Sequence, residues 1–363
     1  MNGQEQEGFC RFDMNVDHGY RSSSYYAYVE RRYRRANLDV RSGVTAHKVR
    51  FEHRRASAVE FYQGGEKFQV RVDREIILSA GAIGSPQLLL LSGVGPADEL
   101  RRVGITPLHD LPGVGANLHD HIELDLQWEC KQPITINGLL RPHRIAAIGL
   151  QWLLFRYGYA AGNQCHVGAF LRSSPTVVHP NIQFHFFPVC FDGWVPRRDI
   201  HGFRVAAGGM RQTSRGSLRL RSANLRDPPI LDPNYLATDE DRREMRECYG
   251  LIREIVSQRA FDPYRGVPLE PSVMPEADEE IDALGRRLGA SSFHLCGTCK
   301  MGSESDPTAV VDPKTRVRGL TGLRVVDASI IPSIVSSNLN APTMMIGERA
   351  SDLIRGKSLG RAV

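Results

Sequence analysis

The feature that most constrains the fold is an apolar run that passes directly into a glycine-rich turn and a second apolar run, REIILSAGAIGSPQLLLLSG (residues 74–93). The first run is short and rich in isoleucine, which predicts a buried β-strand. The second run predicts a helix, with Ser85 as the N-cap and Pro86 at the first helical position. A strand that exits through glycine into a helix N-terminus favours an α/β domain of the dinucleotide-binding type.

The rest of the chain places β-rich sequence between this element and a second strand-to-helix element near the end. We predict an α/β (mixed α+β) fold, with a dinucleotide-type domain and an inserted domain built on an antiparallel sheet flanked by helices. The predicted elements are strands within 36–79 with a turn at Gly64 and Gly65, helices at 141–157, 239–258, 276–290 and 340–355, β-like runs within 165–225, and a strand over 323–329 that ends in Asp327.

Charge and cysteine content set the broad class. The net charge is +5, and the basic cluster at residues 31–35 occurs without a nucleic-acid-binding motif. We therefore interpret that cluster as a solvated helix face and expect no nucleic-acid partner. No run approaches the roughly 18 apolar residues of a membrane span. The seven cysteines are odd in number and scattered, which favours reduced thiols and a cytoplasmic location, with association to a membrane surface left open.

The segment SSFHLCGTCKMG (residues 291–302) contains His294, Cys296 and Cys299 and allows three interpretations: a structural zinc site, a redox cysteine pair or an acid–base histidine. Structural zinc needs four ligands, and a second cysteine pair is missing. A redox CxxC follows a strand and opens a helix, whereas Lys-Met-Gly-Ser follows Cys299. The third interpretation is that the histidine performs acid–base chemistry. The zinc and redox alternatives are less favoured, and we predict no metal.

A second histidine cluster lies in LHDHIEL (residues 118–124). If this stretch is one strand, His119, His121 and Glu123 share a face, because side chains alternate along a strand. Two or three aligned ligand types on a strand occur often by chance. A zinc site here is therefore no better supported than one at the cysteines.

Whole segments of the chain resemble the glucose–methanol–choline (GMC) family of flavin oxidoreductases. GAIGSPQLLLLSGVG (residues 81–95) resembles the second signature of that family, and the similarity extends from about residue 7 to 355. Within the family, the sequence of these segments resembles that of choline dehydrogenases. The other matching segments are LPGVGANLHDH (111–121), GTCKMG (297–302), VVDPKTRVRGLTGLRVVDASIIP (310–332) and SSNLNAPTMMIGERASDLI (336–354).

The resemblance implies FAD-dependent oxidation of a small-molecule primary alcohol to an aldehyde, with hydride transfer to flavin N5. It identifies His294 as the catalytic base, a role that suits imidazole because its unperturbed pKa lies near neutral pH. It places Asn338 beside His294 to orient the substrate oxygen. Cys296 and Cys299 then have no chemical role, and His119 and His121 are family positions rather than metal ligands.

The resemblance also implies the FAD contacts and the domain limits. We expect a partial FAD-binding domain over residues 1–125, a substrate-binding domain over 126–290, and a return to the FAD domain over 291–363 that carries the catalytic segment. The implied FAD-binding residues are Gly81, Ala82, Ser85, Ser292, Asp327, Ala328, Asn340, Pro342 and Thr343.

One departure from the family is large. The family begins with a strand, a GxGxxG turn and a helix that bind the ADP part of FAD, and this chain shows neither that element nor the later glycine-rich segment. We expect that a separate chain supplies the missing part, or that the chain is a truncated product that holds FAD weakly or not at all. The alternative function is therefore a non-catalytic fragment that binds no flavin.

The second departure concerns the substrate. Choline dehydrogenases carry a glutamate in the segment that matches GNQCHVGAFLRS, and this chain has His166 at that position. An imidazole gives up most of the attraction that a carboxylate has for a trimethylammonium group. On this argument choline is a poorer substrate than an uncharged primary alcohol. The electron acceptor, whether oxygen, quinone or another carrier, is not indicated by the sequence.

Overall fold

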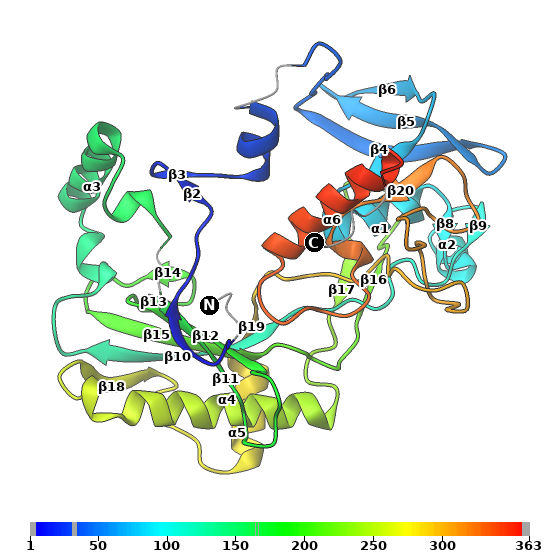
Figure 1. Ribbon diagram of the computed structural model, residues 1–363. Helices are drawn as coiled ribbons and strands as arrows, with labels where there is room; N and C mark the ends of the chain where they lie inside the picture. Colours follow the sequence, from blue (N-terminus) through cyan, green and yellow to red (C-terminus); the bar gives the residue numbers. More distant parts are fainter. Residues whose placement is uncertain (1–4, 31–34, 164, 166, 358–363) are drawn as a thin grey trace. The chain divides into compact units, whose positions relative to one another are not determined.

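The computed structural model describes residues 5–30, 35–163, 165 and 167–357. Most of the predicted basic cluster and His166 lie outside the described residues. The chain divides into two compact units (Figure 1). Unit 1 comprises Met1–Asn37, Ile122–Arg211 and Thr238–Ser292, and unit 2 comprises Leu38–His121, Gln212–Ala237 and Phe293–Val363. Residues 1–37 fall in unit 1 and residues 212–237 in unit 2, whereas the predicted limits place 1–37 in the FAD-binding domain and 212–237 in the substrate-binding domain. The assignment of FAD and substrate binding to these domains stays a prediction.

Unit 1 is built on a seven-stranded sheet with the order β1-β11-β12-β15-β10-β18, in which β19 also pairs with β10. All of these pairings are antiparallel, which confirms the predicted antiparallel sheet. The strands are β1 (Gly8–Arg11), β10 (Ile122–Cys130), β11 (Val167–Leu171), β12 (Ile182–Phe187), β15 (Gly202–Gly209), β18 (Arg265–Glu270) and β19 (Gly289–Ser291).

The two faces of this sheet differ because residues alternate along each strand. On β10, Ile122, Leu124, Leu126 and Trp128 are buried, and helices α4 (Asp239–Ser257) and α5 (Asp278–Leu288) pack against the sheet (Figure 1). Helix α4 begins at an N-cap, Thr238, whose side chain accepts a hydrogen bond from the amide of the third helical residue. The opposite face of β10 carries carboxylates.

Smaller elements complete unit 1. Helix α3 (Pro142–Phe155) packs its Trp152 against the hairpin formed by β2 (Val16–Asp17) and β3 (Tyr20–Arg21), where the indole Nε1 donates to the carbonyl of Gly19 at 2.7 Å. Among the described residues, none of the helices combines the length and the apolar character that a membrane span requires. The remaining elements are a π-helical turn (Tyr26–Glu30), 3-10 turns at Ile136–Leu139, Tyr159–Ala161 and Arg259–Phe261, and β13 (Phe191–Asp192) with β14 (Val195–Pro196).

Unit 2 combines a three-stranded antiparallel sheet with a parallel strand pair. The predicted hairpin turn at Gly64 and Gly65 is confirmed, with φ of 61° and 89°, the backbone that a two-residue type I′ turn requires. The elements are β4 (Val44–Glu52), β5 (Arg55–Gln63), β6 (Glu66–Arg71), β7 (Ile76–Leu78) parallel to β20 (Leu323–Val325), β8 (Val94–Gly95) with β9 (His109–Asp110), β16 (Ser217–Arg219) with β17 (Ile230–Asp232), α1 (Gly81–Leu91), α2 (Ala97–Arg102), the 3-10 turn η5 (Ala328–Ile330) and α6 (Asn340–Ile354).

The predicted start of the first helix is wrong. Helix α1 begins at Gly81, so Ser85 and Pro86 lie inside it. The capping acceptor is Asp327, which follows β20: its Oδ2 accepts from the Gly81 amide at 3.0 Å and from the Ser85 hydroxyl at 2.5 Å. Ser85 therefore donates a hydrogen bond to the capping carboxylate and is not itself the N-cap. The sequence around the helix start could not predict this cap, because Asp327 lies far away in the sequence, near the C-terminal end of the chain.

Candidate active site

Backbone pairings on both sides hold the loop that contains His294. Cys296 pairs with His119, each amide donating to the carbonyl of the other residue at 3.0 Å. Further along the loop, the amide of Cys299 donates to the carbonyl of Ser329 at 2.8 Å. The loop therefore runs between the segment before β10 and the turn η5, and its histidine has a defined position.

Gly297 and Thr298 explain why this loop follows its path. Gly297 has φ of 87°, and a Cβ at that position would lie 2.4 Å from the carbonyl oxygen of Asn117, so only glycine fits. Thr298 is fully buried, and its hydroxyl donates to the carbonyl of Ala82 at 2.6 Å. Pro86 has no N–H to donate to that carbonyl. The threonine of the loop thus replaces the hydrogen bond that the proline removes from α1.

The ring of His294 lies between His121 and Asn338. Its Nδ1 is 2.9 Å from Nδ1 of His121, and its Nε2 is 3.1 Å from Nδ2 of Asn338. The two imidazole rings are perpendicular, with centroids 5.1 Å apart and an interplanar angle of 87°. The structure therefore brings together the two predicted catalytic residues. It adds His121, to which sequence reasoning gave no role, although its place in LHDH could have drawn attention to it.

The hydrogen bonds assign the tautomer of each ring. His121 Nε2 lies 3.1 Å from the carbonyl oxygen of Val335, which can only accept, so this nitrogen carries the proton. In neutral His121, Nδ1 is then an acceptor, and His294 must donate to it from its own Nδ1. The Nε2 of neutral His294 is left without a proton and faces the amide of Asn338. His294 is thus set up to accept a proton at Nε2.

The cysteines are packing residues in this loop. Cys296 and Cys299 are fully buried and belong to two different apolar clusters. Burial raises the pKa of the Cys296 thiol to about 12, with the negative charge of Asp120 acting in the same direction, and burial also raises the pKa of Cys299. A thiol that stays protonated at neutral pH is a poor nucleophile.

The second predicted histidine cluster does not share one strand face. Strand β10 begins only at Ile122, so His119 and His121 precede it. Burial, together with the positive charge of Arg215, lowers the pKa of His119 to about 4, so its ring is neutral. Among the described residues, no group of three or more histidine, cysteine or acidic side chains is arranged to hold a metal ion.

The predicted cofactor residues of unit 2 lie at two helix starts and at the end of β20. Gly81, Ala82 and Ser85 belong to the first turns of α1, and Asn340, Pro342 and Thr343 to the first turn of α6. Asp327 precedes Ala328 in η5 and accepts from the amide of Ser329 at 2.8 Å and from its hydroxyl at 2.5 Å. The turn η5 contacts both α1 and α6, so these residues form one region.

Comparisons with known proteins identify the family. Two family profiles, both described as GMC oxidoreductase, match residues 1–123 and 212–347, which together make up more than half of the chain. This chain belongs to the GMC oxidoreductase family. Its mixed α/β fold with an antiparallel sheet is the fold of solved members of that family.

Among curated GMC relatives, mitochondrial choline dehydrogenase of Homo sapiens is 48% identical over 359 residues, covering 98% of this chain and 60% of the relative. Oxygen-dependent choline dehydrogenase of Brucella ovis is 46% identical over 359 residues, covering 98% and 65%. This GMC chain thus spans less than two thirds of the length of these relatives.

Solved structures give the same result for the fold. Pyridoxine 4-oxidase from Mesorbium loti superposes with a TM-score of 0.85 at 27% identity, covering 98% of this chain and 65% of that one. Formate oxidase superposes with a TM-score of 0.89 at 25% identity, covering 97% and 66%.

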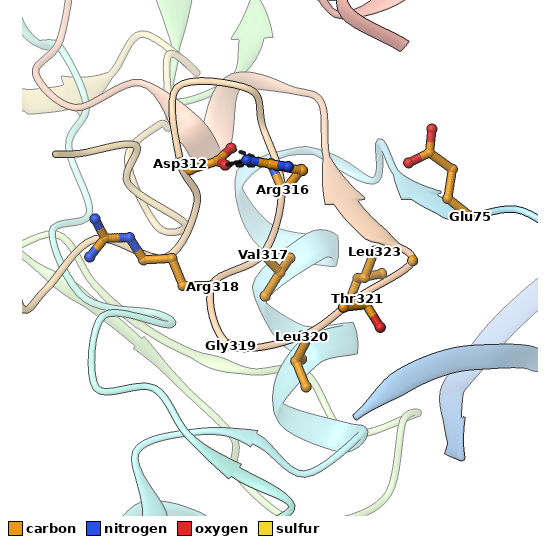
Figure 2. Close-up of a pocket in the computed structure, with 10 residues that line it drawn as sticks. Glu75, Asp312, Arg316, Val317, Arg318, Gly319, Leu320, Thr321 and Leu323 are labelled. Carbon is orange, nitrogen blue, oxygen red and sulfur yellow. Dashed lines mark hydrogen bonds and ion pairs between the residues drawn. The ribbon is translucent and has the colours of Figure 1, made fainter. Parts of the chain in front are cut away.

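A pocket of about 400 Å³ elsewhere in unit 2 contains none of the predicted site residues (Figure 2). It is lined mainly by residues 316–323 with Glu75 and Asp312, and Asp312 forms an ion pair with Arg316 at 2.7 Å. The pocket therefore does not include the surroundings of His294.

Proposed function

We propose that this chain carries the catalytic residues and part of the flavin site of an FAD-dependent enzyme that oxidises a primary alcohol to an aldehyde. The observation that carries the proposal is the His121–His294–Asn338 arrangement, in which an unprotonated nitrogen faces an amide donor. The identity of 46–49% to choline dehydrogenases supports the same reaction class.

The residues around Asp327 suit a dinucleotide. The first turns of α1 and α6 offer backbone N–H groups, and Gly81 presents open space where a side chain would otherwise stand. Ser292, two residues before His294, has a buried hydroxyl oxygen without a hydrogen-bond partner in the described residues, as expected of a group that meets a bound molecule. When bound, FAD supplies the hydride acceptor, flavin N5.

The chain's own residues manage the proton. Nε2 of His294 takes the proton of the substrate hydroxyl, while Asn338 donates to the substrate oxygen and orients it. His121 keeps accepting from Nδ1 of His294, so the imidazolium that forms retains this hydrogen bond. Asn338 does not titrate, which leaves His294 as the base of this pair.

For the substrate we propose a cationic primary alcohol of the choline type. The opposite expectation rested on His166, which lies outside the described residues. The identity to choline dehydrogenases supports this substrate class.

In wild type, the KM for choline is expected to be roughly 10- to 100-fold below that for 3,3-dimethylbutan-1-ol, which has the same shape without the charge, because the neutral alcohol loses the contact that a charged group makes. The measurement is steady-state kinetics on the FAD-loaded protein, with the family's glycine-rich segment supplied if the chain alone does not retain flavin.

A wild type that prefers the uncharged alcohol would contradict the substrate assignment and favour the argument from His166.

A further inference from the structure

The main chain of His294 is held by a buried carboxylate that sequence reasoning did not assign. Asp120 is 4% exposed, and its Oδ1 accepts from the amide of His294 at 2.8 Å. The residue before the histidine, Phe293, has φ of 60°, a left-handed conformation that is unfavourable for a bulky side chain. The backbone alone therefore does not favour this position of His294, and the bond to Asp120 stabilises it.

The other oxygen of Asp120 accepts a short hydrogen bond from the hydroxyl of Tyr235. Tyr235 lies in a loop between two residues with positive φ, Asn234 and Leu236. This loop is itself fixed: the Asn234 side chain donates to the carbonyl of Arg215 at 3.1 Å, and the amide of Ala237 donates to the hydroxyl of Ser214 at 2.9 Å. A constrained loop therefore aims the phenol at Asp120.

We propose that Tyr235 is a positioning residue for the alcohol oxidation and acts through Asp120 on the main chain of His294. With both oxygens engaged, the carboxylate has one orientation, and the histidine amide is bonded in that orientation. Loss of the phenol hydroxyl removes one of the bonds that set this orientation. A shift of His294 by a fraction of an ångström is enough to slow the proton transfer, since catalysis depends steeply on placement.

Tyr235→Phe tests this inference with two readouts. Hydrogen exchange of the His294 amide, measured by NMR without flavin, should accelerate roughly 10-fold, while exchange of the Cys299 amide should not change. In the FAD-loaded protein, flavin reduction at saturating alcohol should slow roughly 10-fold with the KM nearly constant. A merely structural role would accelerate exchange of both amides and would leave the rate of the folded fraction unchanged.

The matched control is Tyr249→Phe, which removes a hydroxyl that donates to the carbonyl of Pro275 at 2.7 Å in unit 1. It should change neither readout. The kinetic readout rests on the proposed function, whereas the exchange readout does not. If wild type oxidises no alcohol, the proposed function fails and the exchange experiment still decides whether Tyr235 holds His294. If the His294 amide of Tyr235→Phe exchanged at the same rate as in wild type, the inference would be overturned.

Discussion

Replacing His294 by alanine is expected to slow flavin reduction by alcohol roughly 10²–10⁴-fold, the usual contribution of a positioned base. Its Nε2 is unprotonated in the neutral ring and lies 3.1 Å from Nδ2 of Asn338. Because the amide of Asn338 is not a base, His294 is the member of this pair that can take the proton. The measurement is anaerobic stopped-flow reduction at saturating alcohol across pH. The wild-type rate should rise with pH through one ionisation of the imidazole type, and the variant should lose this dependence.

The controls come from the same loop and the same pair. Cys296→Ser and Cys299→Ser, singly or together, should retain nearly the full rate, because both thiols are buried and protonated. Asn338→Ala should lie between these variants and His294→Ala, since it orients the substrate oxygen without taking the proton. A slow double cysteine variant combined with a fast His294→Ala would assign the chemistry to the thiols and refute the role of His294.

Replacing Asp327 by alanine is expected to lower the free energy of unfolding by about 3 kcal/mol and to abolish flavin retention. The carboxylate is 5% exposed and accepts from the Gly81 amide and from the hydroxyls of Ser85 and Ser329. Alanine would leave these buried donors without their acceptor and would remove the cap of α1. Urea denaturation measures the first effect, and the visible spectrum after gel filtration measures the second.

Asp306→Ala is the matched control for this experiment. The side chain of Asp306 is 27% exposed, and its pKa is lowered to about 2 by hydrogen bonds from Lys300 and Thr308. Because water can solvate these partners once the carboxylate is gone, the loss of stability should be clearly smaller. Equal urea midpoints for Asp327→Ala and wild type would show that Asp327 does not hold α1 in place.

The local part of the structure followed from the sequence. The β-branched runs and the paired glycines at 64–65 were sufficient to predict the hairpin, because turn geometry depends on the residues of the turn itself. The long amphipathic pattern of 239–258 likewise predicted α4, together with its acidic first turn. The segments that resembled the GMC family led to His294 and Asn338, which the structure brings together.

Features that depend on contacts between distant parts of the chain did not follow from the sequence. Ser85 looked like an N-cap because its neighbours do not reveal Asp327, which lies 242 residues further along and caps the helix instead. His121 looked like part of a strand face, whereas its ring meets His294 from a separate segment. Tyr235 was given no role by its local sequence. In each case the deciding interactions are hydrogen bonds between distant segments, which periodicity and composition do not encode.

The central claim, that His294 and Asn338 form an alcohol-oxidising centre, is tested most directly by adding choline to the FAD-loaded protein without oxygen. We predict that the flavin absorbance bleaches and that the corresponding aldehyde appears in equal amount. The claim would be contradicted if the wild-type flavin stayed oxidised with choline and with 3,3-dimethylbutan-1-ol alike, while a chemical reductant bleached it normally.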